Sequence, residues 1–144
     1  MITDTEKKKV IPLLLEVPLF SSLNKKALGN IANSAAMRTF QSGSTIAKEG
    51  DSGVAFYLIL NGSVEVRRGR KVLAKLGHGQ FFGEMALFDK QPRSADVVAL
   101  EDTDCLLLTS WALSGVIAAN PKIAEQIISE LVRRLRESNR ALSE

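Results

Sequence analysis

Short apolar runs separated by glycines fill the middle of this chain, from Phe40 to about Thr109, and limit the folds open to it. Each run has the length of a β-strand and is too short for a core helix. Short strands at regular spacing with glycine turns are typical of an antiparallel barrel or jelly roll rather than of a parallel sheet. Helical periodicity brackets these runs on both sides. We therefore predict an α+β, mainly β fold: an antiparallel β-roll flanked by N-terminal helices and a long C-terminal helix.

The chain divides into three parts on this pattern. Residues 1–37 are predicted to form a helical N-terminal segment, residues 40–109 the β-roll, and residues 110–144 the C-terminal helices. No internal repeat, low-complexity segment or Gly/Ser/Pro linker separates these parts. A length of 144 residues suits a single hydrophobic core. Residues 1–144 are therefore expected to form one domain.

Turn and capping residues mark where the elements begin and end. Asn61-Gly62 lies between two apolar runs and predicts a β-hairpin, and Arg68-Gly69-Arg70 predicts a second turn. Ser22 and Ser110 are placed to cap helices. Asn120-Pro121 predicts the start of the last helix, in the order of cap and then first helical residue.

The single cysteine, Cys105, and the single histidine, His78, exclude several kinds of site. One cysteine cannot form a disulfide within the chain, and these two ligands cannot build a zinc site or a four-cysteine iron–sulfur cluster. The net charge of +3 favours an anionic ligand but does not by itself argue for nucleic acid. The longest apolar run, Val54 to Leu60, is far too short to cross a bilayer. We expect a cytoplasmic protein with no membrane insertion.

The segment FGEMALFDKQPRSA, residues 82–95, carries the chemistry. Gly83 lets the backbone approach a ligand at a point where a Cβ atom would obstruct it. Glu84 to Phe88 has the length of one helical turn, whose N–H groups attract an anion. The planar fork of Arg93 suits two phosphate oxygens, and the carboxylate of Glu84 suits a sugar hydroxyl. A phosphate and a ribose together indicate a nucleotide.

This segment resembles the phosphate-binding cassette of the cyclic nucleotide-binding domain family, which has the form F-G-E-x-A-L, a few variable residues, then P-R-x-A. A second pattern of that family is an aliphatic residue, G-D-x-G, four apolar residues and a glycine. It is met by Ile46, residues 50–53, residues 56–59 and Gly62. The resemblance covers nearly the whole chain and implies a β-roll that holds cyclic AMP or cyclic GMP.

The resemblance also implies roles for the cassette residues. Arg93 would pair with the cyclic phosphate, and Glu84 would bind the ribose 2′-hydroxyl. Gly83 would give close approach, while Met85 and Ala86 would lie against the ligand and offer it backbone N–H groups. The chain shows no paired acid and base, no nucleophile with an evident activator and no set of metal ligands. We therefore expect a binding protein rather than an enzyme, with no catalytic residue, no metal and no cofactor besides the nucleotide ligand.

The last helix and Ser94 bear on the identity of the base. In members that resemble the cyclic-AMP receptor protein, the last helix covers the base and forms a dimer interface. There Arg134 would lie near the phosphate, and Ser138 and Asn139 near the base edge. Ser94 would touch the phosphate, and its hydroxyl is compatible with either purine. Serine at this position in the bacterial receptor proteins favours cyclic AMP over cyclic GMP.

The last helix carries an apolar seam in alternating steps of four and three residues, as in a coiled coil. The seam consists of Ala124, Ile128, Leu131, Leu135, Ser138 and Leu142. Ile123 and Ile127 lie on a neighbouring face and are expected to pack on the roll. A second copy of the chain is the economical partner for the seam and would give a homodimer. A helix folded over its own ligand would also bury both faces.

Three functions compete for such a chain. The first is a regulatory module that binds a cyclic nucleotide and signals through movement of its C-terminal helix. The second is the sensor half of a dimeric DNA-binding transcription regulator, whose helix-turn-helix would lie beyond Glu144, so that this segment would not itself bind nucleic acid. The third is a roll that has lost its ligand and only dimerises. The intact Gly83, Glu84, Pro92 and Arg93 argue against the third.

Overall fold

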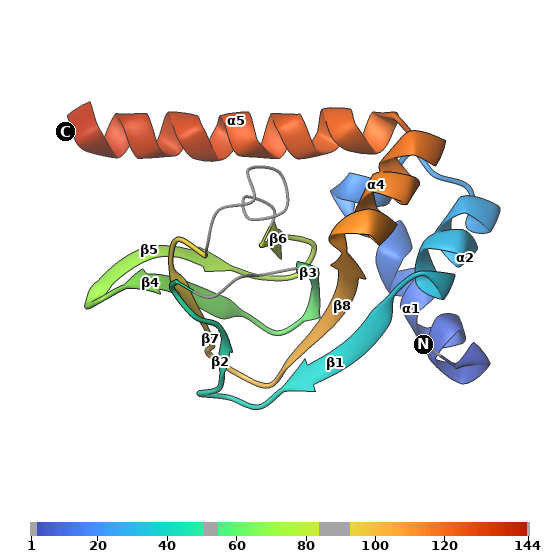
Figure 1. Cartoon of the computed structure of the whole chain (residues 1–144), viewed down its shortest axis with the longest axis horizontal. Helices are drawn as coiled ribbons and strands as arrows, with labels where there is room; N and C mark the ends of the chain where they lie inside the picture. The colour runs from blue at the N-terminus through green and yellow to red at the C-terminus, as the bar shows by residue number, and fades with distance from the viewer. Residues whose placement is uncertain (1–2, 51–54, 84–92, 144) are drawn as a thin grey trace.

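The computed structural model describes residues 3–50, 55–83 and 93–143, which form helices packed on two antiparallel sheets (Figure 1). The helices are α1 (Asp4–Leu15), the 3₁₀-helix η1 (Pro18–Phe20), α2 (Lys25–Asn33), α4 (Ser110–Ala119) and α5 (Lys122–Ser143). The strands are β1 (Ala36–Phe40), β2 (Thr45–Ala47), β3 (Ala55–Asn61), β4 (Val64–Arg68), β5 (Lys71–Leu76), β6 (Phe81–Phe82), β7 (Asp96–Ala99) and β8 (Thr103–Thr109). The predicted mainly β fold with flanking helices is confirmed.

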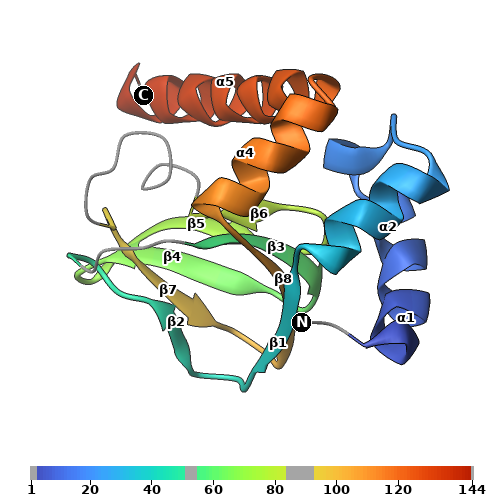
Figure 2. The same cartoon turned by 45° about the vertical axis from the view of Figure 1, so that its right-hand side comes forward.

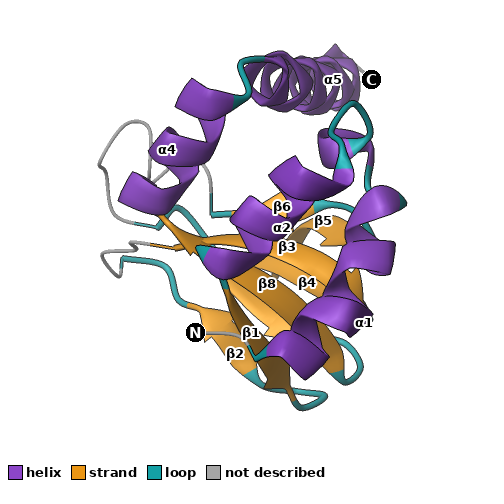
Figure 3. Ribbon diagram, turned by 90° about the vertical axis from the view of Figure 1, so that its right-hand side faces the viewer, coloured by secondary structure: helices purple, strands orange, loops and turns teal. Residues whose placement is uncertain are grey.

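The strands form two sheets that face each other across the roll (Figure 2). One sheet has the order β1-β8-β3-β6 and the other the order β2-β7-β4-β5, and every pairing is antiparallel. The helices gather on the side of the β1-β8-β3-β6 sheet that faces away from the other sheet (Figure 3). This sheet is therefore the middle layer between the helices and the roll interior.

The sequence of strand β3 is a continuous apolar run because both faces of its sheet are buried. Phe56, Leu58 and Leu60 belong to the core shared with the helices, whereas Tyr57 and Ile59 belong to the core inside the roll. Successive side chains of a strand point to opposite faces, so a strand covered on both faces needs apolar residues at every position. The alternation assigns each β3 residue to one of two separate cores.

Cys105 on β8 is packed into the roll interior, as expected for a buried thiol. Burial raises its pKa to about 12, and the nearby carboxylate of Asp104 adds to the effect. The thiol therefore stays protonated at neutral pH and lacks the thiolate character of a reactive cysteine.

The N-terminal helices begin and end differently from the prediction. Thr3 caps α1 in a reciprocal capping box with Glu6, with N–O distances of 3.1 and 3.2 Å. Asn24, not Ser22, caps α2, because its side-chain oxygen accepts a hydrogen bond from the Ala27 N–H at 2.9 Å. Ser22 lies in the turn after η1, a short 3₁₀-helix that ends at Phe20 and that the periodicity did not predict.

Two element boundaries also differ from the prediction. Strand β1 begins at Ala36, so the helical segment predicted to Met37 runs too far. Ala36 and Met37 pair with Leu107 and Leu106 of β8, and this pairing outweighs their helical propensity. At α4 the cap is Thr109 rather than Ser110, since the Thr109 hydroxyl accepts a hydrogen bond from the Ala112 N–H.

The Asn61-Gly62 turn does not close a hairpin, which corrects the strongest turn prediction. Strand β3 before it and β4 after it lie in different sheets, so the turn carries the chain across the roll. Gly62 has a φ of +99°, and a Cβ atom there would lie 2.7 Å from the Asp102 carbonyl oxygen. Glycine is needed because residues 102–103 pass against this turn. The second predicted turn, Arg68-Gly69-Arg70, does join β4 and β5 as a hairpin.

Substituting Gly62→Ala should lower the free energy of unfolding by about 2 kcal/mol or more, because alanine meets both a left-handed φ and a backbone oxygen. Gly43→Ala is the matched control: its φ of +86° is similar, but no atom lies within 4 Å of its added Cβ. Urea denaturation of both variants separates the two causes. Equal losses of unfolding free energy in the two variants would contradict the prediction, because the contact with residues 102–103 would then cost nothing beyond the left-handed φ.

Candidate functional site

The cassette predicted at residues 82–95 lies between β6 and β7, where the described part of the chain includes Phe82, Gly83, Arg93 and Ser94. The predicted site residues Glu84, Met85 and Ala86 lie outside the described residues. The described part of the site consists of the two ends of the cassette and the elements that contact them.

Arg93 is half-buried and ties two strands together through their backbones. Its Nη1 donates to the Gly83 carbonyl oxygen at 3.1 Å, and its Nη2 donates to the Ala55 carbonyl oxygen at 2.8 Å. Gly83 directly follows β6, and Ala55 is the first residue of β3. Within residues 3–50, 55–83 and 93–143, no carboxylate forms an ion pair with Arg93. The guanidinium is thus held by neutral groups and keeps its positive charge uncompensated there.

Gly83 is required by the position of this guanidinium. Its φ is +90°, and a Cβ atom added to it would lie 2.6 Å from Nη1 of Arg93 and 2.7 Å from the Ala55 carbonyl oxygen. Any other residue would meet both a strained backbone and the arginine. The sequence predicted close approach of a ligand at Gly83, and the structure shows close approach of Arg93 itself.

Ser94 is tied to the β4–β5 hairpin by a residue that the sequence did not single out as part of the site. Nε of Arg68 donates to the Ser94 carbonyl oxygen at 3.1 Å. From the sequence alone, the hairpin tip is interpreted as a solvated patch of three arginines, Arg67, Arg68 and Arg70. No local pattern signals that Arg68 reaches the cassette, because the contact spans 26 residues.

Arg134 of α5 contacts the strand that leads into the cassette. Its Nη2 donates to the Phe81 carbonyl oxygen at 2.7 Å, its Cζ lies 4.6 Å from the centroid of the Phe81 ring, and its Nε donates to Glu130 at 3.0 Å. Phe81 precedes Phe82 and Gly83, so α5 and the cassette meet on the same short strand. The predicted position of Arg134 beside a phosphate stays a prediction, and in this structure the side chain contacts β6.

Glu130 organises the cations of α5. Its carboxylate accepts hydrogen bonds from both Arg133 and Arg134, and these lower its pKa, with the Arg133 hydrogen bond as the largest cause. Partial burial acts in the opposite direction but is outweighed. Glu130 therefore holds Arg134 in the orientation in which it reaches Phe81.

Ser138 and Asn139 are exposed residues on the turn of α5 that follows Arg134. Their predicted contact with the base edge of a ligand stays a prediction.

Helix α5 has two apolar faces, as its periodicity indicated. Ile123 and Ile127 are buried in the helical core, which confirms their predicted packing, and Leu131 packs against the same core. Ile128 and Leu135 are each 59% exposed, and Val132 between them is 43% exposed. Two members of the predicted seam, Ile128 and Leu135, thus lie on a face that the chain leaves uncovered, while Leu131 turns inward. In Figure 1 this helix runs along the top of the molecule above the roll.

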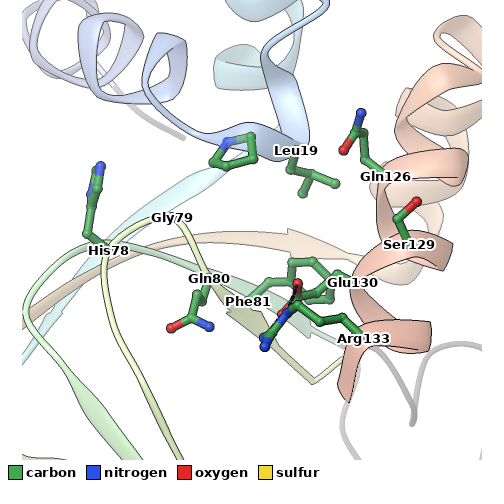
Figure 4. Close-up of a pocket in the computed structure, with 10 residues that line it drawn as sticks. Leu19, His78, Gly79, Gln80, Phe81, Gln126, Ser129, Glu130 and Arg133 are labelled. Atoms are coloured by element: carbon green, nitrogen blue, oxygen red, sulfur yellow. Dashed lines mark hydrogen bonds and ion pairs between the residues drawn. The ribbon is translucent and has the colours of Figure 1, made fainter. Parts of the chain in front are cut away.

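A cavity of about 270 Å³ lies between η1, the loop before β6, and α5 (Figure 4). Leu19 and Phe81 contribute apolar surface, and α5 contributes Gln126, Ser129, Glu130 and Arg133. The cavity borders Phe81 on the helix side of the sheet, whereas Gly83 and Arg93 meet beyond Phe82. It is therefore separate from the described ends of the cassette.

Neither a metal site nor a membrane span is found in the residues that the structure describes. No three His, Cys, Asp or Glu side chains gather closely enough there to hold a metal ion. No described helix is both long and apolar enough to cross a bilayer.

Comparison with known proteins gives a consistent picture. The family model described as "Cyclic nucleotide-binding domain" matches residues 37–120. The "Cyclic AMP receptor protein" of Thermus thermophilus is 36% identical over 127 residues, which cover 85% of this chain and 59% of that protein. A "cAMP-dependent protein kinase regulatory subunit" of Mycosarcoma maydis is 37% identical over 95 residues, covering 63% of this chain and 18% of that protein.

The fold is also similar to that of a solved structure. The crystal structure of Thermus thermophilus catabolite activator protein superposes with a TM-score of 0.78 at 36% identity, covering 88% of this chain and 62% of that one. The chain spans less than two thirds of the length of these curated relatives.

The variant Glu130→Gln should lose less of its free energy of unfolding on acidification than the parent protein does. A lowered pKa means that the folded state binds the proton less tightly than the unfolded chain. The contribution of the Glu130 carboxylate to the free energy of unfolding is therefore present above pH 4.5, the ordinary pKa of this carboxyl group. It is lost as the pH falls through the lowered pKa. Urea denaturation between pH 3 and pH 7 measures this, with Glu125→Gln on the same helix as the control. Identical pH profiles for Glu130→Gln and the parent would contradict it.

Proposed function

The chain belongs to the cyclic nucleotide-binding domain family, and from this premise we propose that it is a regulatory sensor module whose ligand is cyclic AMP. One observation carries the proposal: the cassette arginine, Arg93, is half-buried beside Gly83 with no carboxylate partner in the described chain. A half-buried cation whose described partners carry no full negative charge attracts an anion of suitable shape.

Binding of a cyclic phosphate uses donors that Arg93 still has. A guanidinium has five N–H groups in a rigid fork, and the two backbone contacts of Arg93 occupy two of them. The others can donate to phosphate oxygens, and no ion pair with a carboxylate of the described residues has to be broken first. Glu84 would bind the ribose hydroxyl, Met85 and Ala86 would offer backbone N–H groups, and Ser94 would donate its hydroxyl to the phosphate.

The preference for cyclic AMP over cyclic GMP is supported by two observations. The relative from Thermus thermophilus is named a cyclic AMP receptor protein and aligns over 85% of this chain. Ser94 follows the cassette arginine, as in the bacterial receptor proteins that the cassette resembles. The cytoplasmic location and the absence of enzymatic activity stay predictions from the sequence.

The proposed signal is a shift of α5. This helix is tied to β6 by Arg134 at the Phe81 carbonyl, and β6 leads directly into Gly83 and the cassette. A ligand shifts such an equilibrium only by its different affinity for the two helix positions. If Arg134 leaves the Phe81 carbonyl to bind the phosphate, the ligand binds the shifted position of α5 more tightly than the position seen here.

Titration calorimetry with cyclic AMP and cyclic GMP tests this function. We expect cyclic AMP to bind more tightly, and Arg93→Ala to lose roughly 2–5 kcal/mol of binding free energy, because a buried ionic partner is removed. Arg70→Ala, an exposed arginine of the hairpin, is the control and should bind like the parent. Parent protein that binds neither nucleotide, or an Arg93→Ala variant with unchanged affinity, would refute the proposal.

A second candidate, the sensor half of a dimeric transcription regulator, is favoured by the exposed apolar face of α5. Ile128, Val132 and Leu135 recur at helical spacing on that face. A second copy of α5 would cover these side chains in the manner of a coiled coil. The DNA-binding activity would then belong to a part of the protein beyond this segment.

Sedimentation velocity tests the homodimer. We expect the parent to sediment as a dimer and Leu135→Glu to sediment as a monomer, because a charge would replace an apolar contact in the interface. Val72→Glu, which alters an exposed apolar residue of β5, should leave the dimer intact. A parent that stays monomeric at high concentration would rule out the interface.

A further inference from the structure

Tyr57, the single tyrosine of the chain, forms part of an aromatic group inside the roll. The pairing of β3 with β6 places it opposite Phe82, and the two rings stack with centroids 4.7 Å apart and an interplanar angle of 5°. The ring of Phe40 lies 6.3 Å from Tyr57 on another side. The Tyr57 ring is therefore fixed in place by its neighbours before any ligand arrives.

This fixed ring contacts both residues that meet at the cassette. The guanidinium carbon of Arg93 lies over the Tyr57 ring, 5.8 Å from its centroid. A Cβ atom added to Gly83 would lie 3.4 Å from Cδ1 of Tyr57, so the ring also borders the Gly83 backbone. A cation within about 6 Å of an aromatic face is attracted by the negative face of the ring.

The contacts of Arg93 therefore hold a charge without neutralising it. Two carbonyl oxygens and one ring attract the guanidinium, but none of them carries a full negative charge. An arginine side chain is long and loses conformational freedom when a ligand immobilises it. A ring that already restricts Arg93 reduces this cost for an incoming anion.

We infer that Tyr57 is a positioning residue: its ring, stacked on Phe82, keeps Arg93 oriented to receive the phosphate of the ligand. The inference rests on the proposed function, since it assumes that Arg93 meets a cyclic phosphate. It assigns the effect to the face of the ring and not to the hydroxyl.

Calorimetry with cyclic AMP distinguishes these roles. Tyr57→Phe keeps the ring and should bind like the parent, whereas Tyr57→Leu should bind about three- to tenfold more weakly. Phe40→Leu is the matched control, because it removes a ring from the same group without touching Arg93, and it should bind like the parent. Equal losses in Tyr57→Phe and Tyr57→Leu, or in Phe40→Leu and Tyr57→Leu, would overturn the inference.

A double-mutant cycle tests whether the ring acts through Arg93. In an Arg93→Lys background the ring has no planar fork to orient, so Tyr57→Leu should cause less than a twofold further loss of affinity. A loss as large as in the parent background would show that the ring acts independently and would overturn the inference.

Fluorination keeps the test valid if Tyr57→Leu does not fold. Pentafluorophenylalanine at position 57 preserves the shape of phenylalanine but reverses the charge on the ring face, so it should weaken binding about threefold or more relative to Tyr57→Phe. Equal affinity of these two proteins would overturn the inference. Parent protein that binds no cyclic nucleotide would instead refute the proposed function, so the two failures are distinguishable.

Discussion

The β1-β8-β3-β6 sheet is covered on both faces, and the remaining features of the molecule depend on this burial. Its outer face packs against the helices, and its inner face packs against the second sheet. Strand β6 has only two residues, and they belong to different cores: Phe81 to the helical one and Phe82 to the roll interior. A shift of this strand therefore disturbs both cores together. Such a strand can transmit a change at the cassette to α5 without any long-range rearrangement of the sheet.

Two arginines contact backbone carbonyls around this strand, and the difference between them indicates which one an external anion reaches. Arg134 is held at Phe81 and is also paired with the carboxylate of Glu130. Arg93 is held at Gly83 and Ala55 by neutral oxygens. A charge already paired with a carboxylate gains less from a second anion than one whose partners among the described residues are all neutral. Arg93 is therefore the stronger anchor, and Arg134 is the better candidate for a contact that changes with the position of α5.

The features that local sequence patterns encode were predicted well. The short strands separated by glycines predicted the β-roll, and the helical spacing placed Ile123 and Ile127 on the packed face of α5. The cassette pattern singled out Gly83 and Arg93, which lie in contact, and their binding of a ligand stays a prediction. The helix caps predicted at Ser22 and Ser110 lie one or two residues away, at Asn24 and Thr109, and the larger failures came from contacts between distant segments. The Asn61-Gly62 turn looks like a hairpin locally, but residues 102–103 pass beside it and the next strand joins the other sheet. The contacts of Arg68 with Ser94 and of Arg134 with Phe81 join residues far apart in sequence, and no short-range rule predicts them.

The protonated, buried Cys105 has a practical consequence for spectroscopy. It is the single native thiol, and its pKa of about 12 leaves almost no thiolate at neutral pH. A cysteine introduced at an exposed position, such as Glu125 on α5, would carry nearly all the reactivity toward maleimide reagents. A dye or a spin label could then be attached there while the native residue is kept, so that distances to α5 could be followed in an otherwise unaltered protein.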